Sequence, residues 1–161
     1  MAAVDYFLKI DGIDGESADS KHKGEIDIAS FSWGVANDGS MSGGGGGGSG
    51  KAAFQDLHCN THVHKGSPKL MLASATGEHI KKAVLTVRKA GKDQQEYYKV
   101  TLEDILVSSY TNGGSEGSVF PGEQFSLNYA KIEFDYKEQK ADGTLGGSVK
   151  TGYDVKANKK V

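Results

Sequence analysis

Three histidines and the single cysteine of the chain are the residues best suited to hold a metal ion: His58, Cys59, His62 and His64. Imidazole and thiolate are the usual ligands of zinc, but on an extended strand Cys59 faces away from the histidines. Because a strand from His58 to His64 spans roughly 20 Å, only His62 and His64 could share an ion. No third ligand lies near that pair in the sequence. We therefore expect no metal site, and interpret the histidines as an exposed polar strand face or a subunit contact.

The segment from Gly45 to Lys51 matches the spacing G-x-x-x-x-G-K of a phosphate-binding loop. Such a loop needs Ser or Thr directly after the lysine to hold magnesium, and it must open a helix. Ala52 occupies that position, and the residues after it alternate as a strand does. We expect neither nucleotide binding nor any cofactor.

Nucleophilic catalysis has no better support in the sequence. The chain lacks a G-x-S-x-G elbow. Cys59 follows His58 directly, but neighbouring side chains on a strand point apart and cannot form a nucleophile–base pair. A lone cysteine on an apolar face is more often a small core residue. The sequence thus predicts a protein that is not an enzyme, with no catalytic residues.

The elements that carry these residues are mainly strands. Apolar residues alternate with polar ones over residues 4–10, 83–88, 98–110, 125–136 and 149–155, and this period of two indicates half-buried strands. One short helix is predicted at about residues 68–77, with Ser67 as its cap, Pro68 in its first turn and Gly77 at its exit. The side-chain pattern changes face near Ser30, which indicates a bulge or a strand that leaves one sheet for another, and again near Ala130, which indicates a bulge. The sequence therefore predicts a β-barrel or sandwich with a short flanking helix.

A run of glycine interrupts this pattern between two predicted strands. Six consecutive glycines begin at Gly43, and the run continues through Ser49 and Gly50. Glycine loses the most backbone entropy on ordering and offers no side chain to pack, so such a segment acquires a fixed shape only against something else. We expect residues 36–50 to be an extended loop within one domain, 1–161, and not a linker between two domains.

Composition limits the classes of function further. A formal net charge of −2 argues against a general nucleic-acid binder. One cysteine rules out an intramolecular disulfide and suits a reducing compartment. No apolar stretch approaches the roughly 18 residues of a membrane helix, and the first ten residues lack the features of a signal peptide. We expect no membrane insertion and no cleaved signal peptide.

Several short segments are informative through their order and spacing. They are Asp5–Ile10, Gly15–Ser17, Glu25–Asp27, Ser32–Gly34, Gln55–Leu57, Pro68–Met71, Leu85–Gly91, Leu106–Ser109 and Gln139–Gly143, together with the glycine loop. In this order and spacing they resemble the haemolysin-coregulated protein (Hcp) family of bacterial type VI secretion systems. The resemblance extends over essentially the whole chain.

The resemblance implies a β-barrel of two sheets with one flanking helix, assembled as six-membered rings that stack into a hollow tube. It implies that the tube forms from cytoplasmic protein, inside a sheath and on a spike and baseplate, and is then expelled from the cell. It also implies that small effectors bind within the ring, with Ser32 as the residue expected to face that lumen. The residues expected to contact the neighbouring ring belong to the long loop: Met41, Gly43, Gly44, Gly45, Gly46, Gly47, Gly48, Ser49 and Gly50. The family offers no role for His58, His62 and His64.

A second hypothesis remains open on the residues alone. A monomeric β-barrel could bind a ligand on an aromatic surface made by Phe31, Trp33 and Tyr110, with the glycine loop as a flap. Aromatic residues at strand spacing are, however, more often part of a core or an interface. A third hypothesis, an enzyme acting through Lys51 or through His62 and His64, has the weaknesses given above.

Overall fold

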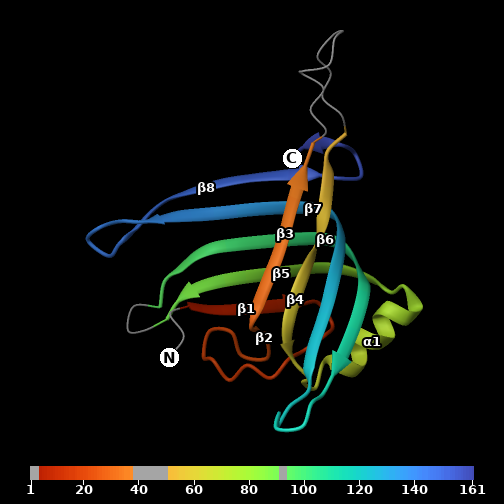
Figure 1. Cartoon of the computed structure of the whole chain (residues 1–161). Helices are drawn as coiled ribbons and strands as arrows, with labels where there is room; N and C mark the ends of the chain where they lie inside the picture. Colours follow the sequence, from red (N-terminus) through yellow and green to blue (C-terminus); the bar gives the residue numbers. More distant parts are fainter. Residues whose placement is uncertain (1–3, 38–50, 91–93) are drawn as a thin grey trace.

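The computed structural model describes residues 4–37, 51–90 and 94–161 (Figure 1). The predicted mainly-β class with one short helix is confirmed. The elements are β1 (Val4–Ile10), β2 (Ile26–Ile28), β3 (Ser30–Ala36), β4 (Ala53–His62), α1 (Ser67–Thr76), β5 (His79–Lys89), β6 (Glu96–Gly113), β7 (Gly122–Gln139), β8 (Leu145–Asp154) and β9 (Lys159–Lys160).

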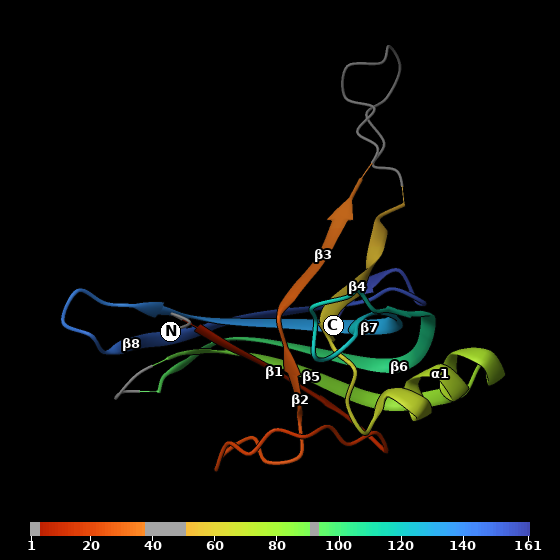
Figure 2. The same cartoon turned by 60° about the horizontal axis from the view of Figure 1, so that its bottom comes forward.

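All strands belong to one antiparallel sheet that folds over on itself. Its order is β2-β1-β5-β6-β7-β4-β3, and β8 and β9 continue from the far half of β7. Figure 1 and Figure 2 show that β6 and β7 bend. Before the bend β6 runs beside β5, and the paired half of β7 runs beside β8; past the bend the other half of β7 runs beside β4, with β6 on its opposite side. The two expected sheets are therefore the two layers of one sheet. We call them the front layer (β3, β4, residues 105–113 and residues 122–130) and the rear layer (the remaining strands).

The chain passes from one layer to the other through a single residue, Ala29. The strand before it, β2, pairs only with β1 among the described strands, whereas β3 after it pairs with β4. This confirms the predicted change of sheet near Ser30. Within the described residues no ladder joins β2 to β3, so hydrogen bonding does not close the sheet into a complete barrel.

The bend of β6 and β7 is made by both strands at the same point. Leu102 and Ile105 are both buried, and so are their partners Ile132 and Tyr129. Side chains alternate between the two faces of a strand, so residues three positions apart lie on opposite faces. Because both members of each such pair point into the core, each strand turns its other face inward after this point. The ladder keeps its register here, so the predicted bulge near Ala130 is not a one-residue insertion. Instead Asp104, opposite Ala130, adopts a left-handed conformation with φ 53°.

The hydrophobic core fills the space between the two layers, and aliphatic residues from both layers form it. Cys59 belongs to this core, as its strand position suggested, and its burial raises the pKa of the thiol. The rear layer contributes Leu8, Ile10, Leu85, Leu102 and Ile132, and the front layer Leu57, Cys59, Val107, Phe125 and Leu127.

The helix α1 packs Leu70 and Ala73 against this core. Gly77 ends it in the left-handed conformation with φ 68°, as predicted. The expected cap at Ser67 is wrong: the residue before the first turn is Gly66, and Ser67 lies inside the helix. A side chain at Gly66 would not fit, because its Cβ would lie 2.6 Å from the carbonyl oxygen of Asp14.

A buried carboxylate ties the end of β4 and the start of α1 to β6 and β7. Glu123 accepts hydrogen bonds from Tyr110 Oη (2.7 Å) and from His64 Nε2 (3.0 Å), and Ser67 adds a third. His64 Nδ1 accepts from the backbone N–H of Gly66, so the ring proton lies on Nε2. Burial alone would raise the pKa of Glu123, but these three donors outweigh it and hold that pKa below its ordinary value.

The strained backbone at Asp104 yields a first prediction. A β-branched side chain is disfavoured at positive φ, whereas glycine is free of that strain. Asp104→Val should therefore lower the free energy of unfolding by about 1–2 kcal/mol relative to Asp104→Gly. Urea denaturation at pH 7 measures the difference. Thr101→Val, in the extended part of the same strand, should be tolerated; equal stability of the two Asp104 variants would contradict the role given to this bend.

The carboxylate of Glu123 yields a second prediction. A carboxyl group whose pKa is lowered on folding stabilises the fold above its ordinary pKa, and that contribution is lost as the pH falls through and below it. Glu123→Gln should cost about 1–3 kcal/mol at pH 7, and the cost should shrink between about pH 5 and pH 3. Denaturation curves across that range test this. Glu116→Gln, at an exposed hairpin position, is the control; a cost for Glu123→Gln that is independent of pH would refute the assignment.

Candidate functional site

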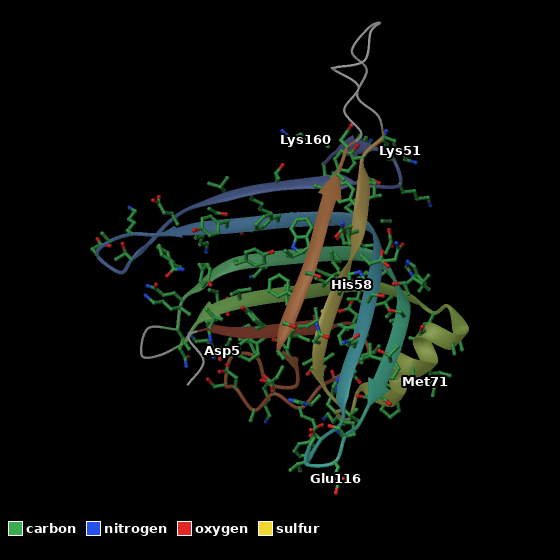
Figure 3. All side chains as sticks on the ribbon, in the orientation of Figure 1. Asp5, Lys51, His58, Met71, Glu116 and Lys160 are labelled. Carbon is green, nitrogen blue, oxygen red and sulfur yellow. The ribbon has the colours of Figure 1, made fainter. Side chains whose placement is uncertain are left out.

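Ser32 lies on the outward side of the front layer, away from the core. It stands in one cross-strand row with His58 of β4, Ser126 of β7 and Ser109 of β6. The inward rows on either side hold buried core residues, so every member of this row points outward. Figure 3 labels His58, which marks this row on β4. Ser32 is thus placed on an exposed, strand-built surface, as a contact residue must be.

Hydroxyl and amide side chains cover most of this surface. We call it the polar face and define it as the outward residues of the row of Ser32 and of the rows on either side of it. Asp56 carries the only formal charge among them, and the set holds no lysine or arginine. The residues are Ser30, Ser32, Asp56, His58, Asn60, Ser108, Ser109, Thr111, Gln124, Ser126 and Asn128, and the apolar Leu106, which lies opposite Asn128, also belongs to the set.

A hydrogen-bonded network runs through the middle of the polar face. Ser126, which is only 2% exposed, lies 2.5 Å from Ser109 Oγ and 2.7 Å from Ser108 Oγ. Ser108 Oγ in turn donates to Asp56 Oδ2 (2.6 Å), and Asn128 Nδ2 donates to Asp56 Oδ1 (2.8 Å). The network links β4, β6 and β7 on their outward side and fixes the orientation of its side chains.

Two hollows on the polar face provide room for a partner. One of about 230 Å³ is lined by His58, Asn60, Ser109, Thr111 and Gln124, among others. A neighbouring one of about 540 Å³ shares three of these residues and extends to His62. Both are open at the surface, so they suit protruding side chains of a protein partner better than an enclosed small molecule.

The three histidines have different surroundings in the structure. His58 is exposed on the polar face, and His62 is exposed at the end of β4. His64 lies beyond the strand, with both ring nitrogens occupied by Gly66 and Glu123. His64 therefore has no free ring nitrogen for an ion shared with His62. Within residues 4–37, 51–90 and 94–161, no group of three His, Cys, Asp or Glu side chains could hold a metal ion.

The aromatic residues of the second hypothesis are used for packing. Phe31 contacts Tyr6 edge-on at 5.2 Å. Trp33 donates from Nε1 to Tyr98 Oη (2.8 Å) and lies edge-on to a phenylalanine ring of β7. Both side chains are half-buried against the core, and Tyr110 is engaged by Glu123. These three residues do not present a common outward surface.

The residues expected to contact a neighbouring ring, Met41 and Gly43 to Gly50, lie outside the described residues. The strands that flank them are described. Figure 3 labels Lys51 and Lys160 at one end of the molecule and Glu116 at the opposite end. In the part of the chain that the structure describes, no helix has the length and apolar character needed to cross a membrane.

Sequence reasoning missed a buried charged cluster that holds the loop between β1 and β2. The guanidinium of Arg88 contacts Asp19 at 2.6 Å and Asp5 at 3.1 Å, and lies over the ring of Phe7. The hydrogen bond from Arg88 holds the pKa of Asp19 well below its usual range. No local pattern signals this cluster, because its members are far apart in the sequence. It supports the rear layer and does not reach the polar face.

Comparison with known proteins agrees with this architecture. Residues 7–136 match the family described as "Type VI secretion system effector, Hcp". The chain is 47% identical over 158 residues to "Protein hcp1" of Pseudomonas aeruginosa, a match that covers 97% of this chain and 98% of that protein.

Solved structures give the same result. The fold matches Hcp1 of Salmonella typhimurium with a TM-score of 0.84 at 37% identity, over 99% of this chain and 100% of that one. It matches a structure described as a type six secretion system protein with a TM-score of 0.93 at 31% identity, again over 99% and 100%. The chain therefore belongs to the Hcp family of type VI secretion system proteins.

Proposed function

We propose that this chain is a structural subunit of the type VI secretion inner tube, which forms stacked hexameric rings and carries small effectors in the ring lumen. The observation that carries the proposal is the position of Ser32 on a hollowed, nearly uncharged polar face built from four strands. A lumen wall must contact cargo and also release it, and hydroxyl and amide groups bind through modest, exchangeable hydrogen bonds. Membership of the family supports this reading.

Ring formation is supported by open strand edges. In the described part of the chain, β3 pairs on one side only, with β4, and β2 pairs only with β1. Unpaired edges are covered or paired in stable proteins, and assembly with other copies is one way to do so. A head-to-tail contact closes into a ring when the rotation that relates one subunit to the next divides a full turn into equal steps.

Stacking of rings is assigned to the long loop at residues 36–50. β3 ends at Ala36 and β4 begins at Ala53, so the loop leaves the fold at the end that Lys51 marks in Figure 3. A glycine-rich segment gains definite form by docking on another copy. The tube then assembles in the bacterial cytoplasm with sheath, spike and baseplate proteins, and is expelled from the cell. Its role in this proposal is structural and not enzymatic.

Deletion of Gly43 to Gly48 tests the assembly. Loop length costs little stability, so the variant should keep its melting temperature and its rings but lose ring-on-ring stacking. Light scattering and negative-stain electron microscopy, at the same protein concentration as the parent, measure both properties. Unchanged stacking would refute the role of the loop. A parent protein that shows only a 17.0 kDa species would refute the ring itself and favour a monomeric binding module.

Substitution of Ser32 tests the cargo contact. Ser32→Glu places a bulky charge on the polar face without touching the core, so rings should persist while effector carriage falls. Quantitative mass spectrometry of the culture supernatant measures the small effectors released together with this protein. Ser20→Glu, in the exposed loop between β1 and β2, is the matched control. Normal effector release by Ser32→Glu rings would contradict a lumen-facing Ser32.

A further inference from the structure

Asp56 is a carboxylate on the polar face that has hydrogen-bond donors but, among the described residues, no cationic partner. Its Oδ2 accepts from Ser108 and its Oδ1 from Asn128. Four Lys or Arg ion pairs and four His–carboxylate contacts occur among the described residues, and Asp56 takes part in none of them. Its side chain is half-buried, so solvent screens its charge less than that of a fully exposed carboxylate.

The charge of Asp56 sets the direction of every hydrogen bond in the serine network. A carboxylate only accepts hydrogen bonds, so Ser108 donates its single hydroxyl proton to Asp56. The bond between Ser108 and Ser126 must then be donated by Ser126, and the bond between Ser126 and Ser109 by Ser109. All three hydroxyl protons thus point along the chain toward Asp56. The exposed Ser108 and Ser109 can therefore only accept hydrogen bonds from a partner, through the lone pairs of their hydroxyl oxygens.

The surroundings do not offset this polarity. The polar face carries no lysine or arginine, and the hollow beside the network is lined by Ser109 and other uncharged side chains. The field of Asp56 also reaches inward: burial, and after it the negative charge of Asp56, raises the pKa of Tyr129. The centre of the polar face is therefore a patch of hydrogen-bond acceptors around one uncompensated negative charge.

We propose that this patch binds cationic side chains, lysine or arginine, of the protein cargo, and so selects cargo that presents a basic segment to the polar face. The inference rests on the proposed role of that face in carrying effectors. An ammonium or guanidinium group supplies only donors, which matches the acceptor oxygens of Asp56, Ser108 and Ser109, and such charge-assisted bonds are roughly twice as strong as neutral ones. An acidic segment meets lone pairs and like charge, and is rejected.

The test uses three capped peptides of one design, Gly-X-Ser-X-Gly-X-Gly, in which X is lysine, glutamine or glutamate. Binding to the full protein is followed by backbone NMR shifts of polar-face residues at about 0.02 M and 0.3 M salt. The lysine peptide should bind about tenfold more tightly than the glutamine peptide and lose most of that advantage at the higher salt. The glutamate peptide should not bind. Equal binding of the three peptides would overturn the proposal.

Two variants assign the effect to the network. Asp56→Asn keeps the shape, removes the charge and allows the serine chain to reverse, so the lysine preference should disappear. Ser109→Ala keeps the charge but removes the outermost acceptor, and should weaken lysine binding by about threefold. Glu116→Gln removes one charge at the distant hairpin and should change nothing. Lysine binding that survives Asp56→Asn, in a protein with an unchanged melting temperature, would refute the inference.

The outcomes separate this inference from the function on which it rests. If Asp56→Asn has no effect while Ser32→Glu still blocks effector release, the polar face carries cargo but does not select basic segments. If the lysine preference holds while the protein remains a 17.0 kDa monomer, the acceptor patch is real and the tube assignment fails.

Discussion

The coordinated bend of β6 and β7 is the constraint on which the rest of this structure depends. Both long strands change the face that they turn inward, opposite one another and without losing register. A single sheet can thereby fold over and enclose a core between two of its own layers. Without the bend the sheet would have one apolar and one polar side over its whole length, and nothing to cover the apolar side. The bend requires a left-handed backbone conformation at Asp104, with φ 53°, which is unfavourable for a residue with a side chain.

The same bend creates the surface to which we assign the function. Because the front layer turns its apolar residues toward the rear layer, its opposite side is left as a field of hydroxyl and amide groups. Buried polar contacts then make this layer rigid. Glu123 anchors the lower ends of β6 and β7 to the turn before α1, and the serine network joins β4, β6 and β7 from outside. A rigid platform suits a surface that is repeated in an assembly, since each copy must present the same geometry.

The charged groups inside this molecule and the charged group on its polar face have different partners. The buried charges, Arg88 with its aspartates and Glu123 with its three donors, are paired or hydrogen-bonded, and they hold loops and strand ends in place. The polar face carries one half-buried carboxylate whose partners are neutral. A neutral surface with a single oriented centre of charge can favour one class of cargo by modest amounts and still release it, which a densely charged wall would not do.

The sequence by itself determined the class of the fold, most of the strands, the helix with its exit at Gly77, and the family. Those features follow from alternation over short stretches and from segments read in order, which are local properties of the chain. Only the tertiary structure decided that Ser67 is not a cap, that the ring nitrogens of His64 bond Gly66 and Glu123, and that the change of face near Ala130 is a bend at Asp104 without an inserted residue. It also decided the network from Ser109 to Asp56, because those residues come from strands that are far apart in sequence and meet only when the sheet pairs. A hydrogen bond depends on distance and direction in space, and no local pattern of residue types specifies either.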